Sequence, residues 1–216
     1  MIYYLYKQYL SEFIKKTVEK MANSLRKSKK VNHFDGKLIY TNECTGCYNL
    51  DVKGNGSLFR EGDNSMAYSV FDIANWFLLK EKMTNKKLQK LCYYAQAWAY
   101  AFNDRGMFDG EFEAWVHGPV NRSLWNSLSQ YGYLDIEQDK FSSQARAIDD
   151  DATLELLEDV WATYGEFSGG QLESLTHKED PWLNARIGYE KYEPSSKKIS
   201  TNDMRDYYRS KLKTGG

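Results

Sequence analysis

After residue 65, apolar residues recur at spacings of three and four, which is the pattern of helices that bury one face. Four of these patterns follow a residue that can cap a helix N-terminus: Ser69, Thr84, Ser168 and Ser200. Three positions after each of the three serines, the sequence has an acidic residue or a glutamine, as in a capping box. The sequence therefore predicts a helix after each of these four residues and a further helix over 151–164.

Prolines and glycines predict where other elements begin and end. Residues 111–120 alternate enough to form a short strand, with a Gly-Pro pair near its end to break it. Pro119 suits the first turn of a following helix, and Gly132 suits the C-terminus of that helix. Asp180 followed by Pro181 predicts the N-cap and the start of another short helix.

Together these patterns predict six or seven helices and at most three short strands. The predicted fold is mainly α: a compact multi-helix domain with a minor β-hairpin or short strands, preceded by a helical or irregular N-terminal extension. The helix after Thr84 carries aromatic residues on more than one face, so we expect it to be the central buried helix. Cys92 shares the phase of its apolar face and is predicted to be a core residue, not a nucleophile.

The first 65 residues differ from the rest of the chain in composition and charge. Residues 1–65 contain 11 basic and 7 acidic residues, whereas residues 66–216 contain 18 and 23, with all six Trp and all three Pro. The first part has one helical pattern, over 10–25, then a basic run and a Gly/Asn-rich stretch at 46–57 that indicates a loop or weak hairpin. We therefore expect a domain at 66–216 and a variable extension at 1–65.

The extension has a second explanation. The codons for residues 60–63 can spell a purine-rich ribosome-binding site just before Met66, which would then be the natural start. On this hypothesis residues 1–65 are translated from upstream DNA. A pyrimidine-rich choice among those codons would count heavily against it.

Composition and charge narrow the class of protein. With 42% hydrophobic and 27% charged residues, the chain has the composition of an ordinary globular protein. A net charge of −1 gives no general attraction to nucleic acid or to an anionic membrane. The longest apolar stretch, 92–102, is too short for a membrane span, and three cysteines do not make a disulfide framework. These features predict a cytoplasmic protein with no membrane or nucleic-acid partner.

Cysteine and glycine motifs give little support for metal or phosphate chemistry. Cys44 and Cys47 have the spacing of two zinc ligands, but a structural site needs two more, and only His33 is near in sequence. The glycines do not form a phosphate-binding loop, and no G-x-S-x-G occurs. We interpret the cysteine pair as incidental and predict no metal and no cofactor.

Two histidines are the strongest candidates for catalysis. His117 and His177 stand on non-repetitive backbone beside predicted helix starts, where binding groups often collect. With Glu179 or Asp180 they could form a metal site or an acid–base pair, although no metal-binding spacing such as H-E-x-x-H is present. A structural role, in which each ring bonds loop backbone, is the favoured interpretation of both.

Three sequence blocks follow one another in the predicted domain: KLQKLCYYAQAW at 87–98, FDGEFEAWVHGPV at 108–120 and LESLTHKEDPW at 172–182. In this order they resemble the Panacea domain, the SocA-like and GepA-related family of bacterial and phage proteins. The resemblance runs from about residue 66 to residue 212. One departure is Ala99, where relatives often carry a histidine or another polar residue. The matching motif positions, which bind or are structural, are Lys90, Leu91, Tyr94, Trp115, His117, Gly118, Pro119, Thr176, His177, Asp180, Pro181 and Trp182.

The resemblance implies a function as an antitoxin of a two-gene toxin–antitoxin system. Family members bind and neutralise a separately encoded protein toxin, and some also present it to an ATP-dependent protease. On this hypothesis the chain is not an enzyme, and its exposed aromatics and acidic 66–216 surface meet a more basic toxin. Two alternatives stay open: a phage-encoded inhibitor of host defence, and a hydrolase that uses the two histidines with Asp180, with or without a metal.

Overall fold

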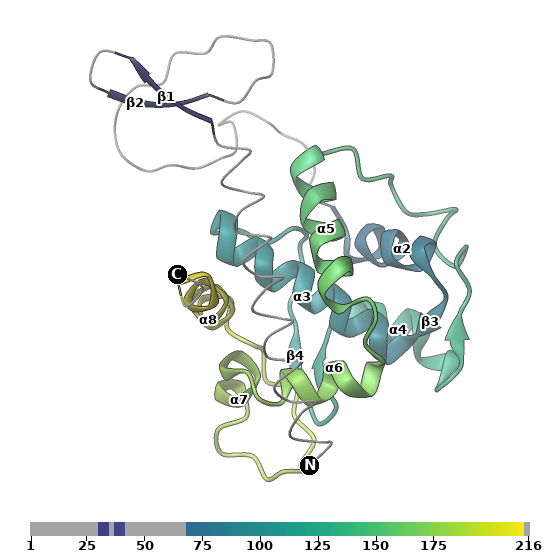
Figure 1. Cartoon of the computed structure of the whole chain (residues 1–216). Helices are drawn as coiled ribbons and strands as arrows, with labels where there is room; N and C mark the ends of the chain where they lie inside the picture. Colours follow the sequence, from purple (N-terminus) through teal and green to yellow (C-terminus); the bar gives the residue numbers. More distant parts are fainter. Residues whose placement is uncertain (1–29, 35–36, 42–67, 214–216) are drawn as a thin grey trace, which may run out of the picture. The chain divides into compact units, whose positions relative to one another are not determined.

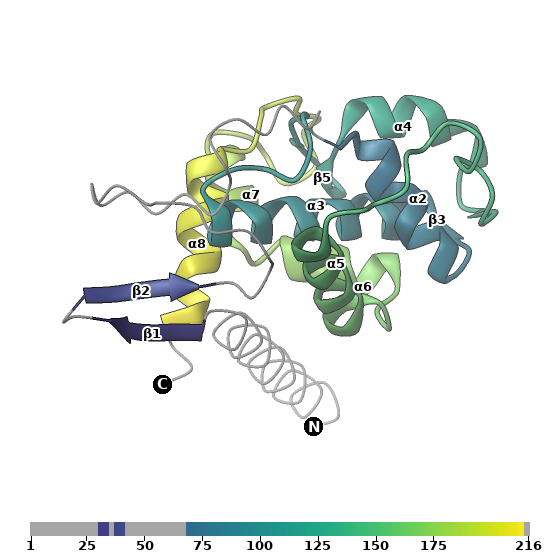
Figure 2. The ribbon, with the colours of Figure 1, turned by 90° about the horizontal axis from the view of Figure 1, so that it is seen from above.

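One long helix, α3 (Asn85–Asn103), forms the centre of the compact unit Asn64–Lys213. The computed structural model describes residues 30–34, 37–41 and 68–213. Fourteen of the 19 residues of α3 are buried, as the aromatic residues on several of its faces predicted. Figures 1 and 2 show α3 crossing the middle of this unit with the other helices around it.

The described part of the chain is mainly α, which confirms the predicted fold class. It contains three antiparallel two-stranded ladders, in which β1 pairs with β2, β3 with β6, and β4 with β5. A 3-10 turn follows the fourth helix. The other elements are α2 (Val70–Lys80), α4 (Arg122–Leu128), α5 (Asp151–Tyr164), α6 (Gly169–Thr176), α7 (Asp180–Ala185), α8 (Thr201–Lys213), β1 (Lys30–Phe34), β2 (Lys37–Thr41), β3 (Met83–Thr84), β4 (Glu113–Trp115), β5 (Gly118–Val120) and β6 (Asp135–Ile136).

Most of the predicted helix starts are confirmed. Ser69 and Ser168 each form a complete capping box with the side chain three positions on. The side chains of Thr84 and Ser200 each accept a hydrogen bond from the backbone N–H three positions on. Each cap satisfies a helical N–H that would otherwise lack a partner, so helices begin where such residues precede an apolar pattern.

The predicted helix start at Pro119 is wrong. Pro119 lies in β5, opposite Ala114 of β4, and α4 begins only after Asn121, whose side chain caps it. The N–H of Ala114 bonds the carbonyl oxygen of Lys197, on the side away from β5. Ala114 and Pro119 are therefore a non-hydrogen-bonded pair of the ladder. Such a pair needs no backbone N–H at the position of Pro119. The expected single strand is instead a hairpin that tolerates a proline.

The predicted N-cap at Asp180 is wrong by one position. Asp180 is the first residue of α7, Pro181 follows it in the first turn, and Glu179 holds the N-cap position. The Glu179 carboxylate makes no capping bond and instead accepts hydrogen bonds from Tyr94 and Tyr208. A contact with distant helices thus overrides the local capping pattern.

An aromatic cluster fills the space between α3, α5 and α8. The rings of Tyr94 and Tyr164 stack at 3.9 Å between centroids, and Trp98 packs edge-on against Tyr208 at 5.0 Å. Trp98 also donates its indole N–H to the Tyr164 hydroxyl at 3.2 Å. Cys92 is fully buried in the same helix, which confirms its predicted place in the core.

The hairpin of β1 and β2 is a structure that the sequence patterns above did not predict. Its register pairs Phe34 with Lys37, which leaves two residues between the strands. Those two are Asp35 and Gly36, and an Asp-Gly dipeptide is a strong hairpin signal. The sequence analysis did not use this signal.

Several other predictions lie outside the described residues. They are the helix over 10–25, the Cys44–Cys47 pair, the loop or hairpin at 46–57 and a natural start at Met66. The domain boundary at residue 65 stays a prediction. None of the helices in the described ranges has the length and apolarity that a membrane span requires.

Candidate functional site

The three sequence blocks meet at the β4–β5 hairpin, where β5 packs against α3 and α6. Gly118 opens β5 with a φ of +90°. A Cβ atom on this residue would lie 2.7 Å from Cε of Lys90 and 2.8 Å from Oγ1 of Thr176. Both neighbours are buried, so glycine is needed here for its conformation and for the close approach of the hairpin to two helices.

Lys90 ties α3 to this hairpin from inside the protein. Its side chain is buried, and Nζ donates a hydrogen bond of 3.0 Å to the carbonyl oxygen of Pro119. Burial lowers the pKa of Lys90 from its ordinary 10.5 to about 7, with the charge of Glu173 opposing the shift and that of Lys86 adding to it. The motif lysine therefore bonds the hairpin backbone and is not available to a ligand at the surface.

Replacing Lys90 with methionine should remove a pH dependence of stability. Between pH 7 and 10.5, Lys90 holds fewer protons in the folded chain than in the unfolded chain. The free energy of unfolding therefore rises with pH in this window, by at most ~1.4 kcal/mol per pH unit. In urea titrations from about pH 7.5 to 9.5, we expect wild type to gain about 2 kcal/mol relative to Lys90→Met.

Lys178→Met is the matched control, because Lys178 is exposed and lies in another of the three motif blocks, 172–182. This variant should keep the pH dependence of wild type. Parallel curves for wild type and Lys90→Met would contradict the lowered pKa, whatever the difference in absolute stability.

His117 lies at the turn of the hairpin and is exposed. Its Nδ1 is 2.9 Å from one carboxylate oxygen of Glu173, and Nζ of Lys86 is 2.6 Å from the other. Burial acts to raise the pKa of Glu173, but the hydrogen bonds from Lys86 and His117 outweigh it and lower the pKa. Glu173 thus links the hairpin turn to α3 and α6.

His177 ends α6 and has a different environment from His117. Its ring stacks on Trp182 with 4.0 Å between centroids, and Trp182 donates its indole N–H to the carbonyl oxygen of Trp115 at 3.0 Å. Burial lowers the pKa of His177, and the charges of Lys90 and His117 add to this effect. The neutral ring is therefore favoured, as suits a residue that packs between α7 and the hairpin.

Glu179 is a polar group of this region that the motif positions did not include. Tyr208 donates a hydrogen bond of 2.8 Å to one carboxylate oxygen, and Tyr94 one of 3.3 Å to the other. Burial raises the pKa of Glu179 to about 7, although both hydrogen bonds act to lower it. Through this carboxylate, α3, α7 and α8 are joined at one point.

The predicted site residues therefore fall into two groups. Lys90, Gly118, Pro119 and Thr176 form one buried contact, and Leu91, Pro181 and most of Trp182 are also buried. Asp180 is exposed at the start of α7, while His117 pairs with Glu173 and His177 stacks on Trp182. Within the described residues, no group of three His, Cys, Asp or Glu side chains is placed to hold a metal ion.

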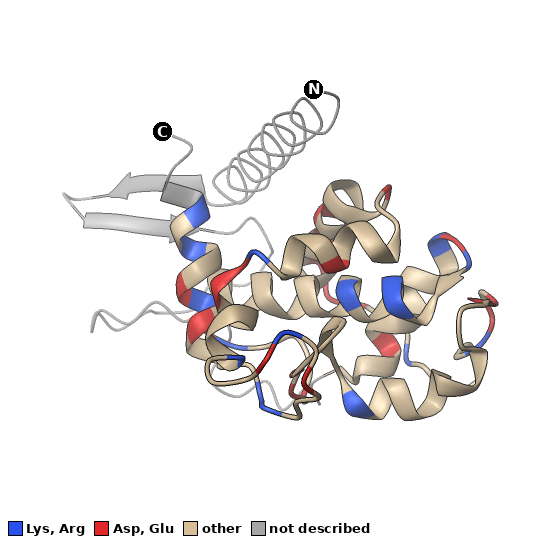
Figure 3. Cartoon of the chain, turned by 90° about the horizontal axis from the view of Figure 1, so that it is seen from below, with Lys and Arg blue, Asp and Glu red and all other residues tan. Residues whose placement is uncertain are grey.

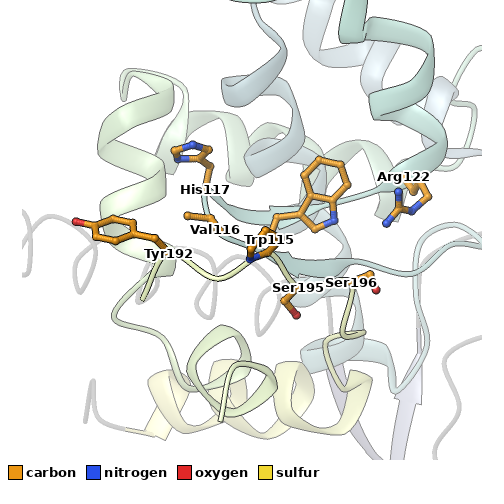
Figure 4. A pocket seen from close by; sticks show the side chains of 8 residues that line it. Trp115, Val116, His117, Arg122, Tyr192, Ser195 and Ser196 are labelled. Atoms are coloured by element: carbon orange, nitrogen blue, oxygen red, sulfur yellow. The ribbon is translucent and has the colours of Figure 1, made fainter. Parts of the chain in front are cut away.

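A pocket of about 630 Å³ opens beside the hairpin (Figure 4). Trp115 and Arg122 line it on the hairpin side, and Tyr192 and Pro194 line it on the side of the segment before α8. Arg122 is paired with the carboxylate of Glu113, at 2.8 Å from Nε, and the indole N–H of Trp115 donates to the same carboxylate. The charges at the pocket wall are thus already matched within the protein.

Arg186 joins β4 to the segment after α7, next to the residues that line this pocket, and the sequence patterns did not single it out. It is buried, and its guanidinium donates hydrogen bonds of 2.8–3.0 Å to the carbonyl oxygens of Ala114, Glu190 and Glu193. An arginine near the end of a short helix carries no signal that it will bond a carbonyl group 72 positions away as well as two nearby ones. The five donors of a guanidinium make it suited to this task.

A family model described as an antitoxin SocA-like, Panacea domain matches residues 88–183. This match confirms the resemblance to the Panacea family. The matched residues include nearly all of the three blocks that carried the resemblance, and they extend from α3 into α7. No curated protein and no solved structure matches the chain. The buried contact of Lys90, Gly118 and Thr176 lies entirely within the matched residues.

Proposed function

We propose that this chain is an antitoxin that binds and neutralises a separately encoded protein toxin and has no catalytic activity of its own. The observation that carries the proposal is the match of residues 88–183 to the SocA-like antitoxin family. The toxin would be bound directly, as one folded protein by another.

The placement of the motif residues supports two separate roles: some residues hold the fold, and others are left to bind the partner. Lys90, Gly118 and Thr176 are buried, and a partner cannot reach them without unfolding the hairpin. They fix how β4 and β5 sit on α3 and α6. A partner must therefore be recognised by exposed side chains outside this buried contact, where aromatic residues contribute most to interface energies.

The environments of the two histidines differ in the chemistry that they allow. A general base needs a substrate-accessible ring held by an orienting group. His117 is accessible, and Glu173 can orient its ring through Nδ1, although this carboxylate is shared with Lys86. His177 is partly buried against Trp182, which favours a structural role for this ring. The preference for binding over hydrolysis therefore rests on the family match, and the His117→Ala variant tests it.

Co-expression with the adjacent reading frame tests the proposed function. If that frame encodes the toxin, its expression alone should stop growth, and the full chain should restore it. His117→Ala should restore growth as well as wild type does, because the exposed ring is not used in catalysis. Loss of rescue by a folded His117→Ala variant would favour the hydrolase, and a harmless neighbouring gene would count against the antitoxin.

The amount of toxin in rescued cells separates two modes of neutralisation. Simple sequestration leaves the toxin level unchanged or higher, because bound toxin is tolerated. Delivery to an ATP-dependent protease lowers the toxin level, and the level recovers when the protease is removed.

A further inference from the structure

The loop after α4 exposes large apolar side chains that the rest of the described chain does not cover. Tyr133 is 94% exposed and Leu134 is 72% exposed, and Leu79 at the end of α2 is 57% exposed. Nε2 of Gln138 donates a hydrogen bond of 3.1 Å to the carbonyl oxygen of Leu79, so the loop and the end of α2 are adjacent. We call Leu79 together with residues 133–139 the 133–139 surface.

Acidic residues outnumber basic ones around these apolar side chains when α5 is included, although Lys80, Lys82 and Lys140 lie at the edge of the 133–139 surface. Asp135, Glu137 and Asp139 lie within the 133–139 surface itself, and no Lys or Arg occurs between Arg122 and Lys140. The neighbouring helix α5 belongs to a stretch, 147–177, that contains eight acidic residues and no Lys or Arg.

The end of α2 connects the loop to this acidic stretch. Nζ of Lys80 is 2.6 Å from the carboxylate of Glu158 in α5, and the adjoining Leu79 bonds Gln138 of the loop. Lys80 offsets one acidic charge of α5. The 133–139 surface and α5 therefore lie on either side of the end of α2, and their charges act together on an approaching partner.

Other exposed apolar residues lack such a bias in charge. Near the pocket, Ile187 and Tyr192 are 77% and 74% exposed, but Glu190, Lys191 and Glu193 stand among them, with two more lysines at 197 and 198. Along α8, two acidic residues in the first half are followed by basic residues only, so this helix has no acidic excess (Figure 3). Neither place has the excess of acidic charge that attracts a basic partner.

We propose that the 133–139 surface is the docking site for a basic, amphipathic segment of the protein partner. Apolar side chains of that segment would cover Tyr133, Leu134 and Leu79, while its Lys or Arg residues face the acidic loop and α5. Burial of the apolar side chains supplies affinity, and the acidic surroundings supply selectivity and a faster encounter at low salt. The inference rests on the proposed function only where it identifies the partner as a toxin. The basic, amphipathic character of the docking segment is inferred from the 133–139 surface and α5.

The binding test uses the full chain and two fluorescent probes, a short synthetic helix of Lys and Leu and a counterpart of Glu and Leu. We expect the Lys helix to bind and the Glu helix not to bind. Tyr133→Ser/Leu134→Ser should weaken binding about 10-fold, as the loss of two apolar anchors does. Asp135→Asn/Glu137→Gln/Asp139→Asn should weaken it about 5-fold at low salt and much less at high salt.

Ile187→Ser/Tyr192→Ser is the matched control, because it removes two equally exposed apolar side chains on the pocket side. It should bind the Lys helix as wild type does. Unchanged binding by the Tyr133→Ser/Leu134→Ser variant, equal binding of both helices, or loss of binding in the control alone would overturn the proposal. All these substitutions are at exposed positions, and melting curves will show that the fold is kept.

Growth rescue with the adjacent gene separates this inference from the proposed function. If wild type rescues and Tyr133→Ser/Leu134→Ser does not, both are supported. If both rescue equally, the chain is an antitoxin that binds its toxin elsewhere, and the docking site is wrong. If wild type does not rescue, the antitoxin function fails, and the peptide measurements alone decide the docking site.

Discussion

Gly118→Ala should lower the free energy of unfolding by about 3 kcal/mol. A residue with a Cβ at a φ of +90° carries a conformational penalty of about 1 kcal/mol or more. The new methyl group would also lie 2.7 Å from Lys90 Cε and 2.8 Å from Thr176 Oγ1, and overpacking at a buried contact costs a further 1–3 kcal/mol or so. Urea unfolding followed by tryptophan fluorescence measures the loss, because all six tryptophans lie after residue 65.

Gly188→Ala is a close control for this experiment. Gly188 also has a φ of +90°, but a Cβ there meets nothing within 4 Å. This variant should lose only the conformational penalty of about 1 kcal/mol. Equal losses for the two variants would mean that the hairpin does not press on Lys90 and Thr176, and the buried contact would lose its role as the framework of the site.

Local sequence signals predicted the helices well because each signal satisfies a local requirement. Ser69 and Ser168 can bond a backbone N–H three positions away regardless of the rest of the chain, and they do so in the structure. The position of α5 followed from its apolar period alone. The central place of α3 followed from the number of aromatic residues around it, since such a helix has no face suited to water.

The errors arose where distant residues decide the outcome. Pro119 could remain in a strand only because Ala114 turns its N–H toward Lys197, 83 positions further along the chain. Glu179 stands at the N-cap of α7, but its side chain does not cap the helix, because two tyrosines from other helices bind its carboxylate. Neither partner is visible in the local sequence.

The resemblance named candidate residues for the site, but it did not predict how they are arranged. The resemblance supplied Lys90, Gly118 and Thr176 as motif positions, but only their contact in space explains why these three residue types are needed. Arg186 and Glu173 are as important to the hairpin and carried no pattern of their own. Polar residues that bond backbone groups of another element leave no periodic trace in a sequence.

Trp98→Ala should cause the largest loss of stability, about 3–5 kcal/mol, because Trp98 is nearly fully buried at the centre of the aromatic cluster. Its ring packs against Phe102 and Tyr208, and its N–H bonds the Tyr164 hydroxyl, so one truncation removes contacts to α5 and α8 at once. Trp98→Phe should lose about half as much, since a ring remains but the hydrogen bond does not.

Tyr192→Ala removes a large aromatic side chain that is 74% exposed, and it should change stability by less than about 0.5 kcal/mol. The same urea experiment measures all three variants.

α8 reaches the core mainly through Met204 and Tyr208, so the cavity left in Trp98→Ala should also loosen this helix. Limited proteolysis should then cut the segment before α8 in Trp98→Ala well before it cuts wild type. A protected α8 in Trp98→Ala would show that Met204 and the Tyr208–Glu179 bond hold this helix without the tryptophan.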